Sequence, residues 1–367
     1  MTGRSAFVRR LVLGLATAWL CLSGSAAQAD QPLQKITWAF GDKAVLPYLV
    51  NWVIPQYLGY FRQEGLDVDF APAGSNAPVI AGLKAGRFQI GPGLAAFQLP
   101  MLARGENLPY VDFFEYTYPF KFGMAVKEGS AIKSFAQFKG KKIGLHSFGT
   151  AEYPIAQELV RRAGLDPEKD VSWISVGEGL TGGLMLQRGD IDGLMYYDTG
   201  FGQIEAAGIK LKYLTFPPDF PKIGGAFLAT TPDILKHHPA WAVGIGRAML
   251  KASLFTLTNP EAATYIFLKM YPEAAPKGMS IQDAVKAVMV PVTKRMPLFA
   301  PYDKSVKWGY MKKSDWEDEV DFAGLRGKIT DAQLATLYTN ALIDQINDFD
   351  HAKIVRQARD FELPYKR

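Results

Sequence analysis

Apolar and polar residues follow two short-range patterns through the first two thirds of the chain. Between residues 59 and 93, Val68 and Phe70 alternate with aspartates, and Val79 and Leu83 recur at helical spacing. Alternation with a period of two predicts a strand with one buried face, and a spacing of three to four predicts a helix. A strand, a helix and a second strand within about thirty residues predict a parallel α/β unit.

A second segment repeats this arrangement later in the chain. Residues 186–193 match residues 83–90 in the register of leucine and glycine, and Ile191 takes the place of Phe88. A helix, a glycine and a strand also follow one another in many unrelated α/β proteins, which is the alternative explanation. Taken with the surrounding elements, the repeat predicts two lobes of similar construction.

The same patterns predict the remaining elements. Pro55 is expected to kink the first helix, and Gly91-Pro92-Gly93 to form a turn. Expected strands cover residues 35–40, 68–70, 88–90, 110–118, 122–126, 141–145, 171–176, 191–195, 211–214 and 226–229. Expected helices cover residues 45–61, 95–103, 134–138, 153–163, 180–187, 204–207, 240–257, 262–270, 281–294, 305–316 and 331–346.

Two segments mark where the chain passes between the lobes. Pro119-Phe120-Lys121 separates two expected strands, and the rigid stretch 217–221 precedes the strand that returns. These crossings predict lobe 1 from residues 30–119 and 222–367, and lobe 2 from residues 120–221. The later helices are expected to pack on lobe 1, with the last ones clasping it. Two crossings permit the lobes to close around a ligand.

The first 29 residues have the three parts of a secretory signal peptide. Three arginines precede an apolar run at residues 11–22, and Ala27-Gln28-Ala29 is a small-residue cleavage site. The apolar run is too short for a transmembrane anchor, which is the alternative. We therefore expect export, cleavage after Ala29 and a mature protein in the periplasm.

Removal of this segment changes the charge balance. The full chain has 41 basic and 36 acidic residues, and loss of the three arginines leaves 38 against 36, a net charge of about +2. Such a balance offers no basic field to attract nucleic acid or an anionic membrane. The single cysteine, Cys21, also leaves with the signal, so the mature chain has no disulfide, thiol nucleophile or thiolate metal site.

The sequence lacks the common motifs of catalysis and cofactor binding. None of the four histidines has metal-ligand spacing, and there is no Walker loop, dinucleotide fingerprint or nucleophile elbow. Asp190 and Asp192 form a carboxylate pair whose spacing favours a solvated turn. We therefore predict no catalytic residues, no metal and no cofactor. An exported two-lobe protein without reactive groups is expected to bind a molecule rather than transform it.

Loops at strand ends carry residue types that contact small ligands. Ligands of open α/β sheets bind beyond the carboxyl ends of strands, which selects Gly41-Asp42 and Tyr197-Asp198. The loop at 146–150 opens a helix, and the free N–H groups there suit an anion or a carbonyl. Its hydroxyl residues equally fit ordinary N-caps. Trp38 lies on an alternating strand, so core packing is its alternative role.

Five blocks of sequence occur in the order found in one protein family. They are GYFRQEGLDVDF (59–70), AGSNAPVIAGLKAGRFQIGPG (73–93), FKGKKIGLHSFGT (138–150), DPEKDVSWISVG (166–177) and RGDIDGLMYYD (188–198). With Trp38, these blocks resemble the solute-binding proteins of ABC importers. The nearest subgroup binds sulfonates, taurine, nitrate or thiamine-pyrimidine precursors. The resemblance covers roughly residues 35–260.

This resemblance implies a type II periplasmic binding fold. Each of the two α/β lobes would hold a mainly parallel sheet flanked by helices, with extra C-terminal helices in this chain. The implied partners are a small-molecule solute and the membrane permease of an ABC importer, with a monomer as the default state. Tyr116, at the first crossing, is an additional candidate contact. Transferred block by block, ligand contacts fall at Trp38, Gly41, Asp42, Ser75, Asn76, Ser147, Phe148, Gly149, Thr150, Glu178, Tyr197 and Asp198.

Two alternative functions stay open, and so does the chemical class of the solute. The family resembled includes an enzymatic branch, the eukaryotic thiamine-pyrimidine synthases, whose cysteine-rich CCCFC motif this chain lacks. A binding protein that senses solute for a receptor is the other alternative. Aromatic residues at the expected cleft favour a flat solute. Glu178 and Asp198 favour N–H or cationic groups on the solute, whereas the loop at 147–150 favours oxyanions.

Overall fold

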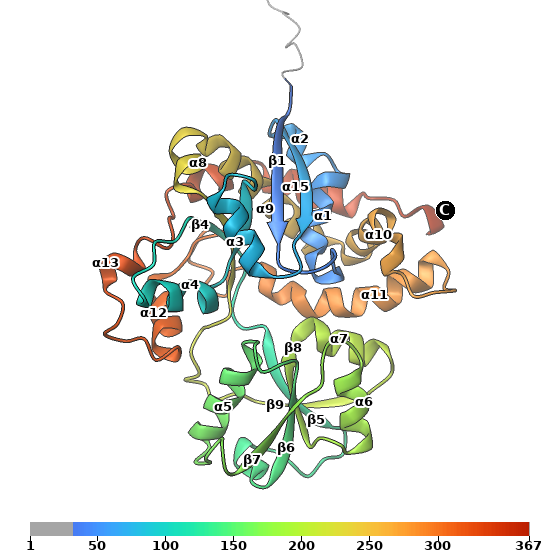
Figure 1. Cartoon of the computed structure of the whole chain (residues 1–367). Coiled ribbons are helices and arrows are strands. Elements are labelled where there is room, and N and C mark those ends of the chain that lie inside the picture. Colours follow the sequence, from blue (N-terminus) through green and yellow to red (C-terminus); the bar gives the residue numbers. More distant parts are fainter. Residues whose placement is uncertain (1–31, 367) are drawn as a thin grey trace, which may run out of the picture.

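The computed structural model describes residues 32–366 and contains two lobes, each built on a five-stranded sheet (Figure 1). The expected signal peptide at residues 1–29 lies outside the described residues. Lobe 1 is the upper body in Figure 1 and holds both ends of the described chain, whereas lobe 2 is the lower, green body. The sheet of lobe 2 uses only strands between residues 122 and 214.

The sheet of lobe 1 is mixed, with strand order β2-β1-β3-β10-β4. The first three strands are parallel, and β10 runs antiparallel to both of its neighbours. The strand that returns from lobe 2 is thus inserted between β3 and β4. The strands are β1 (Gln34–Phe40), β2 (Leu66–Pro72), β3 (Ile90–Gly93), β4 (Val111–Thr117) and β10 (Ala226–Thr230).

The sheet of lobe 2 repeats this topology, with strand order β7-β6-β8-β5-β9. Here β5, which arrives from lobe 1, is the antiparallel strand inserted beside the parallel trio. The predicted two-lobe α/β fold is confirmed, and in each sheet four strands run in one direction while one strand runs against them. The strands are β5 (Phe122–Lys127), β6 (Lys141–Leu145), β7 (Val171–Ser175), β8 (Gly193–Tyr197) and β9 (Leu211–Leu214).

Helices connect the strands and cover the sheets. Gly86 and Gly189, the matching glycines of the sequence repeat, end equivalent helices with φ of 70° and 84°, a left-handed conformation that glycine adopts at little cost. The connecting helices are η1 (Pro47–Leu49), α1 (Val50–Tyr57), α2 (Tyr60–Gln63), α3 (Asn76–Lys84), α4 (Ala95–Ala103), η2 (Phe135–Phe138), α5 (Glu152–Arg162), α6 (Thr181–Arg188) and α7 (Asp198–Ala206).

The C-terminal third is helical and packs mainly on lobe 1 (Figure 1). One helix departs from this rule, because α11 lies across α7 of lobe 2. These helices are α8 (Pro232–His237), α9 (Pro239–Thr258), α10 (Pro260–Met270), η3 (Pro272–Ala274), α11 (Ile281–Arg295), η4 (Met296–Phe299), α12 (Lys313–Phe322), α13 (Asp331–Leu334), α14 (Ile343–Asn347), α15 (His351–Arg359) and η5 (Pro364–Lys366).

Several predicted boundaries were wrong. The first helix breaks at Gly59, which has a φ of 73°, and Pro55 lies inside the unbroken α1. The predicted turn at 91–93 is instead part of β3, where a Cβ on Gly91 would lie only 2.8 Å from Leu83. The predicted helix at 305–316 starts only at Lys313, and the one at 331–346 is split in two.

The larger core lies in lobe 1 and is rich in aromatic residues. Trp38 and Trp52 are almost fully buried, with ring centroids 4.5 Å apart, and Phe70 packs against both. Because these rings come from β1, α1 and β2, the cluster fixes the helix on the sheet and so positions the loop that follows β1. None of the helices in the described part of the chain combines the length and hydrophobicity needed to cross a membrane.

Candidate functional site

A cavity of about 240 Å³ lies where lobe 1 faces the crossings to lobe 2. We call it the cleft cavity. It opens beyond the C-terminal ends of β1 and β3, as expected for a ligand site in an open α/β sheet. Its polar and aromatic lining consists of Phe40, Asp42, Tyr48, Trp52, Asn76, Tyr116, Thr117, Lys121 and Arg295.

Asp42 presents a half-buried carboxylate to this cavity from the loop after β1. The hydroxyl of Tyr48 donates a hydrogen bond of 2.7 Å to its Oδ2 atom. Burial and the nearby charge of Glu178 raise the pKa of Asp42, although the bond from Tyr48 and the charge of Lys121 oppose that shift. The hydroxyl of Tyr48 therefore fixes the position of the Asp42 carboxylate, which forms no ion pair within the described residues.

One wall of the cavity is aromatic. Trp52 and Tyr116 meet edge to face with ring centroids 5.7 Å apart, and the guanidinium of Arg295 lies 5.2 Å from the ring centre of Tyr48. The indole Nε1 of Trp52 is buried and has no hydrogen-bond partner among the described residues. A buried donor without a partner costs free energy, but this nitrogen is almost inaccessible, so Trp52 contributes to the wall through its aromatic ring.

Lys121 lies at the first crossing and lines the cleft cavity together with a neighbouring cavity of about 270 Å³. Within residues 32–366 its ammonium has no ion pair or hydrogen bond, and it contacts the ring of Phe122 at 5.4 Å. Burial and the charge of Arg295 lower the pKa of Lys121 to about 8, against the opposing charges of Asp198, Glu152 and Glu319. The site thus holds a cation without a fixed counter-ion.

Arg295, in contrast, is firmly paired. Its Nε and Nη2 atoms donate to the two carboxylate oxygens of Asp198 at 2.6 Å each, and both side chains are largely buried. Burial disfavours the charge of Arg295, but Asp198 outweighs burial and raises its pKa. A bidentate arrangement of this kind combines strength with defined geometry. The pair joins α11 of lobe 1 to the start of α7 in lobe 2.

Lobe 2 contributes a second polar group near the cavity. The rings of Tyr196 and Tyr197 lie 4.6 Å apart at the end of β8, and His146 packs edge-on to Tyr196. The hydroxyl of Tyr197 lies 3.5 Å from Glu178, whose charge acts on Asp42 in lobe 1. Carboxylates from both lobes therefore approach one another across the region between them.

The structure brings together four of the predicted contact residues in the cleft cavity: Gly41, Asp42, Asn76 and Tyr116. Gly41 packs so tightly that a Cβ there would lie 2.5 Å from Oδ1 of Asn76. Glu178 and Tyr197 lie on the lobe 2 side. The residues carried over from the resemblance are thus only partly found in the cavity lining.

The other predicted contacts lie elsewhere. Trp38 is fully buried in the lobe 1 core, in agreement with its alternative role, and Ser75 is an exposed N-cap residue. Asp198 is engaged by Arg295, which leaves its carboxylate little capacity for a ligand. The loop of Ser147, Phe148, Gly149 and Thr150 is outside the cavity lining, and Phe148 is 54% exposed.

Sequence reasoning missed several residues of the cavity lining, among them Tyr48, Lys121 and Arg295. Tyr48 follows a proline in a short 3-10 turn, and Lys121 ends the crossing motif that was recognised without a ligand role. Arg295 is the last residue of α11, and no local pattern distinguishes it from other basic residues at helix ends. The position of Lys121 between two lobes was the one usable signal.

The described residues contain no group of His, Cys, Asp or Glu side chains arranged to hold a metal ion. The cavity instead offers a carboxylate, an unpaired ammonium and aromatic faces. Such a lining can orient a small polar molecule that carries both donor and acceptor groups.

This two-lobe architecture is the periplasmic binding protein fold, which solved structures of other proteins share. A protein from Bordetella bronchiseptica RB50 has a TM-score of 0.59 at 19% identity, over 87% of this chain and 98% of that one. The nitrate-binding protein NrtA from Synechocystis PCC 6803 has a TM-score of 0.56 at 12% identity, over 90% and 99%. The aliphatic sulphonate binding protein SsuA from Escherichia coli has a TM-score of 0.54 at 15% identity, over 71% and 84%.

Residues 47–263 match the family described as NMT1/THI5 like, and since this is more than half of the chain, the protein belongs to that family. The resemblance stated from the sequence is thereby confirmed. The riboflavin-binding protein RibY of Chloroflexus aurantiacus is 24% identical over 327 residues, which are 87% of this chain and 88% of RibY. A 4-amino-5-hydroxymethyl-2-methylpyrimidine phosphate synthase of Schizosaccharomyces pombe is 27% identical over 160 residues, which are 43% and 44%.

Proposed function

We propose that this protein is the solute-binding component of an ABC importer. In this role it captures a small organic solute between its lobes in the periplasm and delivers it to the permease subunits in the membrane. The observation that carries the proposal is the cleft cavity, which lies at strand ends between two crossings and combines the carboxylate of Asp42, the unpaired ammonium of Lys121 and an aromatic wall. The default oligomeric state in this proposal is a monomer.

The proposed solute is a sulfonate, a nitrate-like or taurine-like compound, or an aromatic or pyrimidine-type compound. The aromatic wall of Tyr48, Trp52 and Tyr116 favours a flat solute. Lys121 suits an anionic group, and Asp42 suits an N–H group or a cation. The cavity is about 240 Å³ in volume, so the solute is small or is enclosed further when the lobes close.

An enzyme on the same scaffold is the alternative, because curated relatives include the pyrimidine phosphate synthases. The specific observation in its favour is Lys121, whose lowered pKa leaves part of its amine unprotonated near neutral pH. The absence of the cysteine-rich motif argues against an enzyme. The resemblance implies that the enzymes carry this motif, whereas the only cysteine of this chain is Cys21. We propose binding without turnover.

A thermal-shift screen of residues 30–367 tests the binding function. The panel holds sulfonates, taurine, nitrate, pyrimidines, thiamine, riboflavin and aromatic carboxylates. A ligand at a hundred times its dissociation constant adds about 2.7 kcal/mol of stability, which gives a readable shift in Tm. We expect one class to raise Tm, with unchanged solute after incubation as shown by mass spectrometry.

Two variants locate the binding to the cleft cavity. Asp42→Asn is expected to weaken binding of the hit at least tenfold, because it removes the charge that Tyr48 holds in place. Asp190→Asn makes the same chemical change at an exposed residue paired with Arg188, and is expected to bind normally. Equal affinities of the two variants would place the site elsewhere, and consumption of the solute would favour the enzyme.

A further inference from the structure

The segment from η4 to α12 contacts both crossings between the lobes. The carbonyl of Leu298 accepts from the backbone N–H of Tyr118 at 2.8 Å, and the backbone N–H of Gly309 donates to the hydroxyl of Tyr118 at 2.6 Å. On the second crossing, Lys222 and Gly224 donate backbone N–H groups to α12. This segment lies outside residues 47–263, the part of the chain that matches the family model.

Two carboxylates of α12 make the contacts with the second crossing. Oδ2 of Asp318 accepts from Lys222 at 2.8 Å, and Oε1 of Glu319 accepts from Gly224 at 2.6 Å. Gly224 has a φ of 81°, and a Cβ there would lie 2.8 Å from the ring of Phe122 on the other crossing. The second crossing is therefore confined between α12 on one side and the first crossing on the other.

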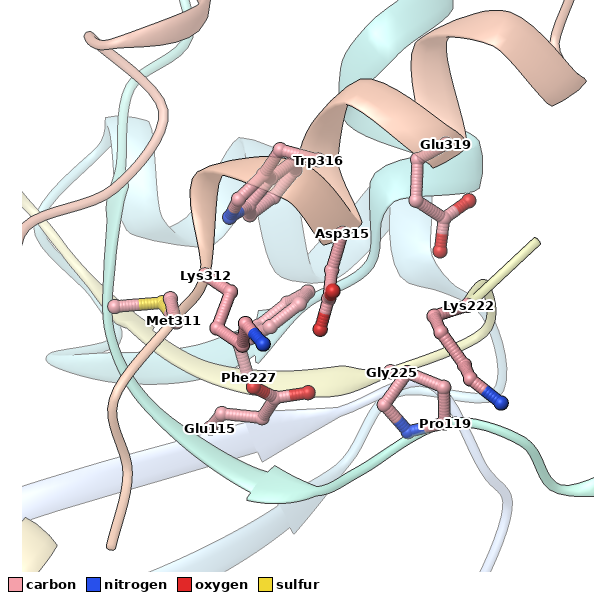
Figure 2. A pocket seen from close by; sticks show the side chains of 10 residues that line it. All are labelled: Glu115, Pro119, Lys222, Gly225, Phe227, Met311, Lys312, Asp315, Trp316 and Glu319. Carbon is pink, nitrogen blue, oxygen red and sulfur yellow. The ribbon is translucent and has the colours of Figure 1, made fainter. Parts of the chain in front are cut away.

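Figure 2 shows this place, with Asp315 and Glu319 pointing from α12 toward the segment that carries Lys222 and Gly225. The pocket is about 10 Å³ in volume, enough for roughly one water molecule, so it is no solute site. A Cβ on Gly225 would lie 2.8 Å from Oε1 of Glu115, which places this buried carboxylate against the same crossing. Carboxylates thus face the second crossing from both β4 and α12.

The charges around Glu319 make its ionisation unfavourable. The groups that face it are Glu115 on β4, Lys121 and Lys222 on the crossings, and Lys312, Asp315 and Asp318 on or beside α12. Burial raises the pKa of Glu319 to about 7, helped by Asp315 and Asp318, while the bond from Gly224 and the charge of Lys121 oppose the shift. Lys312 is occupied by its ion pair with Asp303.

We propose that Glu319 is a positioning residue that controls movement of the lobes. In its protonated form Glu319 holds α12 against the second crossing, an arrangement that we call the clamp, and ionisation of Glu319 loosens it. The direction follows from linkage. If α12 leaves the crossing, Glu319 meets water and its pKa returns toward 4.5, so the clamped arrangement binds the extra proton between about pH 4.5 and 7. Rising pH therefore favours the loosened arrangement.

The clamp is connected to the cleft cavity through Lys121. This side chain lines the cavity, and its charge acts on Glu319 as well as on Asp42. One consequence of the inference rests on the proposed function, namely that pH changes the affinity for solute by changing how the lobes move about the two crossings. The movement itself is measurable without any solute.

The test uses residues 30–367 without solute and two fluorophores. Cysteines introduced at Lys236 of lobe 1 and Glu168 of lobe 2, both exposed, carry the labels, and this part of the chain has no cysteine of its own. Single-molecule energy transfer reports the distribution of distances between the lobes from pH 5.5 to 8.5. In the otherwise native chain we expect the broad, loosened population to grow at least about threefold, with a midpoint near pH 7.

Three variants separate a proton-dependent clamp from a merely structural role. Glu319→Gln keeps a neutral acceptor for the backbone N–H of Gly224. At every pH, its distribution of distances between the lobes is expected to match the distribution that the native chain shows at pH 5.5. Glu319→Ala removes the acceptor and is expected to be loosened throughout. Glu317→Gln makes the same chemical change on the exposed face of α12, at a residue paired with Lys313, and is expected to keep the native profile.

A flat profile in the native chain overturns the inference. A pH-dependent profile that survives in Glu319→Gln also overturns it, because the titrating group is then another one. Since these outcomes involve no solute, they are distinguishable from failure of the solute screen. Where the screen yields a solute, its affinity in Glu319→Gln is expected to lose the pH dependence seen in the native chain.

Discussion

At the scale of single residues, the polar groups of the cleft cavity differ in whether their charges have fixed partners. Arg295 and Asp198 satisfy each other, whereas Lys121 has no counter-ion within the described residues, and Asp42 is balanced only by a hydroxyl and a distant ammonium. Groups that are held in place but incompletely satisfied are free to bind a ligand at low reorganisation cost. The unpaired residues are thus the functional candidates of the cavity.

Lys121→Met is expected to stabilise the protein while it weakens solute binding. Burial lowers the pKa of Lys121 to about 8, compared with 10.5 for a lysine in the unfolded chain. The charged amine therefore destabilises the folded state most below pH 8, and this destabilisation disappears as pH rises toward 10.5. Allowing for water in the cavity, we expect a gain of about 1–2 kcal/mol at pH 7. Urea denaturation at pH 7 and pH 10 measures it, with exposed Lys133→Met as the control. A destabilised Lys121→Met would contradict this account.

At the scale of elements, the contact between α7 and α11 is a third connection between the lobes. Besides the pair of Arg295 and Asp198, Lys294 forms an ion pair of 2.7 Å with Glu205 and lies 5.0 Å from the ring centre of Tyr213. Movement of the lobes must therefore either pivot on this contact or break it.

Gly202 permits this connection by its lack of a side chain. A Cβ there would lie 2.5 Å from Cα of Pro291, a backbone atom that cannot rotate away. Gly202→Ala is therefore expected to lower the free energy of unfolding by about 1–3 kcal/mol, as measured by urea denaturation. Gly149→Ala is the control, since its nearest neighbour is Oγ of Ser147 at 4.0 Å. Equal stability of both variants would show that α7 and α11 separate at little cost.

At the scale of the whole molecule, the two lobes share one strand order and exchange one strand each through the crossings. This construction places the ends of the parallel strands of both lobes toward the same region, which is where the cleft cavity lies (Figure 1).

Export is testable on the intact protein. When the full chain is expressed in a Gram-negative host, we expect it in the periplasmic fraction with Asp30 as its first residue. Intact-mass measurement of that fraction checks the cleavage site. Replacement of Ala27 and Ala29 by bulky residues is expected to block processing, and a mature protein that still carries residues 1–29 would contradict the prediction.

The elements that were predicted well are those specified by local patterns. The expected strands at 141–145 and 211–214 and the helix at 95–103 agree with β6, β9 and α4 residue for residue. Local predictions failed where long-range packing decides, as at Gly91, which continues β3 because Leu83 and Val79 fill the space beside it. The helix expected at 204–207 begins six residues earlier, where Asp198 is fixed by Arg295.

The sequence by itself determined the alternating strands and helices, the two crossings, the repeat of the lobes and the membership of a family of binding proteins, because each depends on residues close together in the chain. Only the tertiary structure decided which side chains meet in the cavity. In that structure Trp38 is buried, Asp198 is paired with Arg295, and Asp42 and Lys121 line the cleft cavity. Those outcomes depend on contacts between residues far apart in the chain, which packing and charge compensation select and local periodicity does not encode.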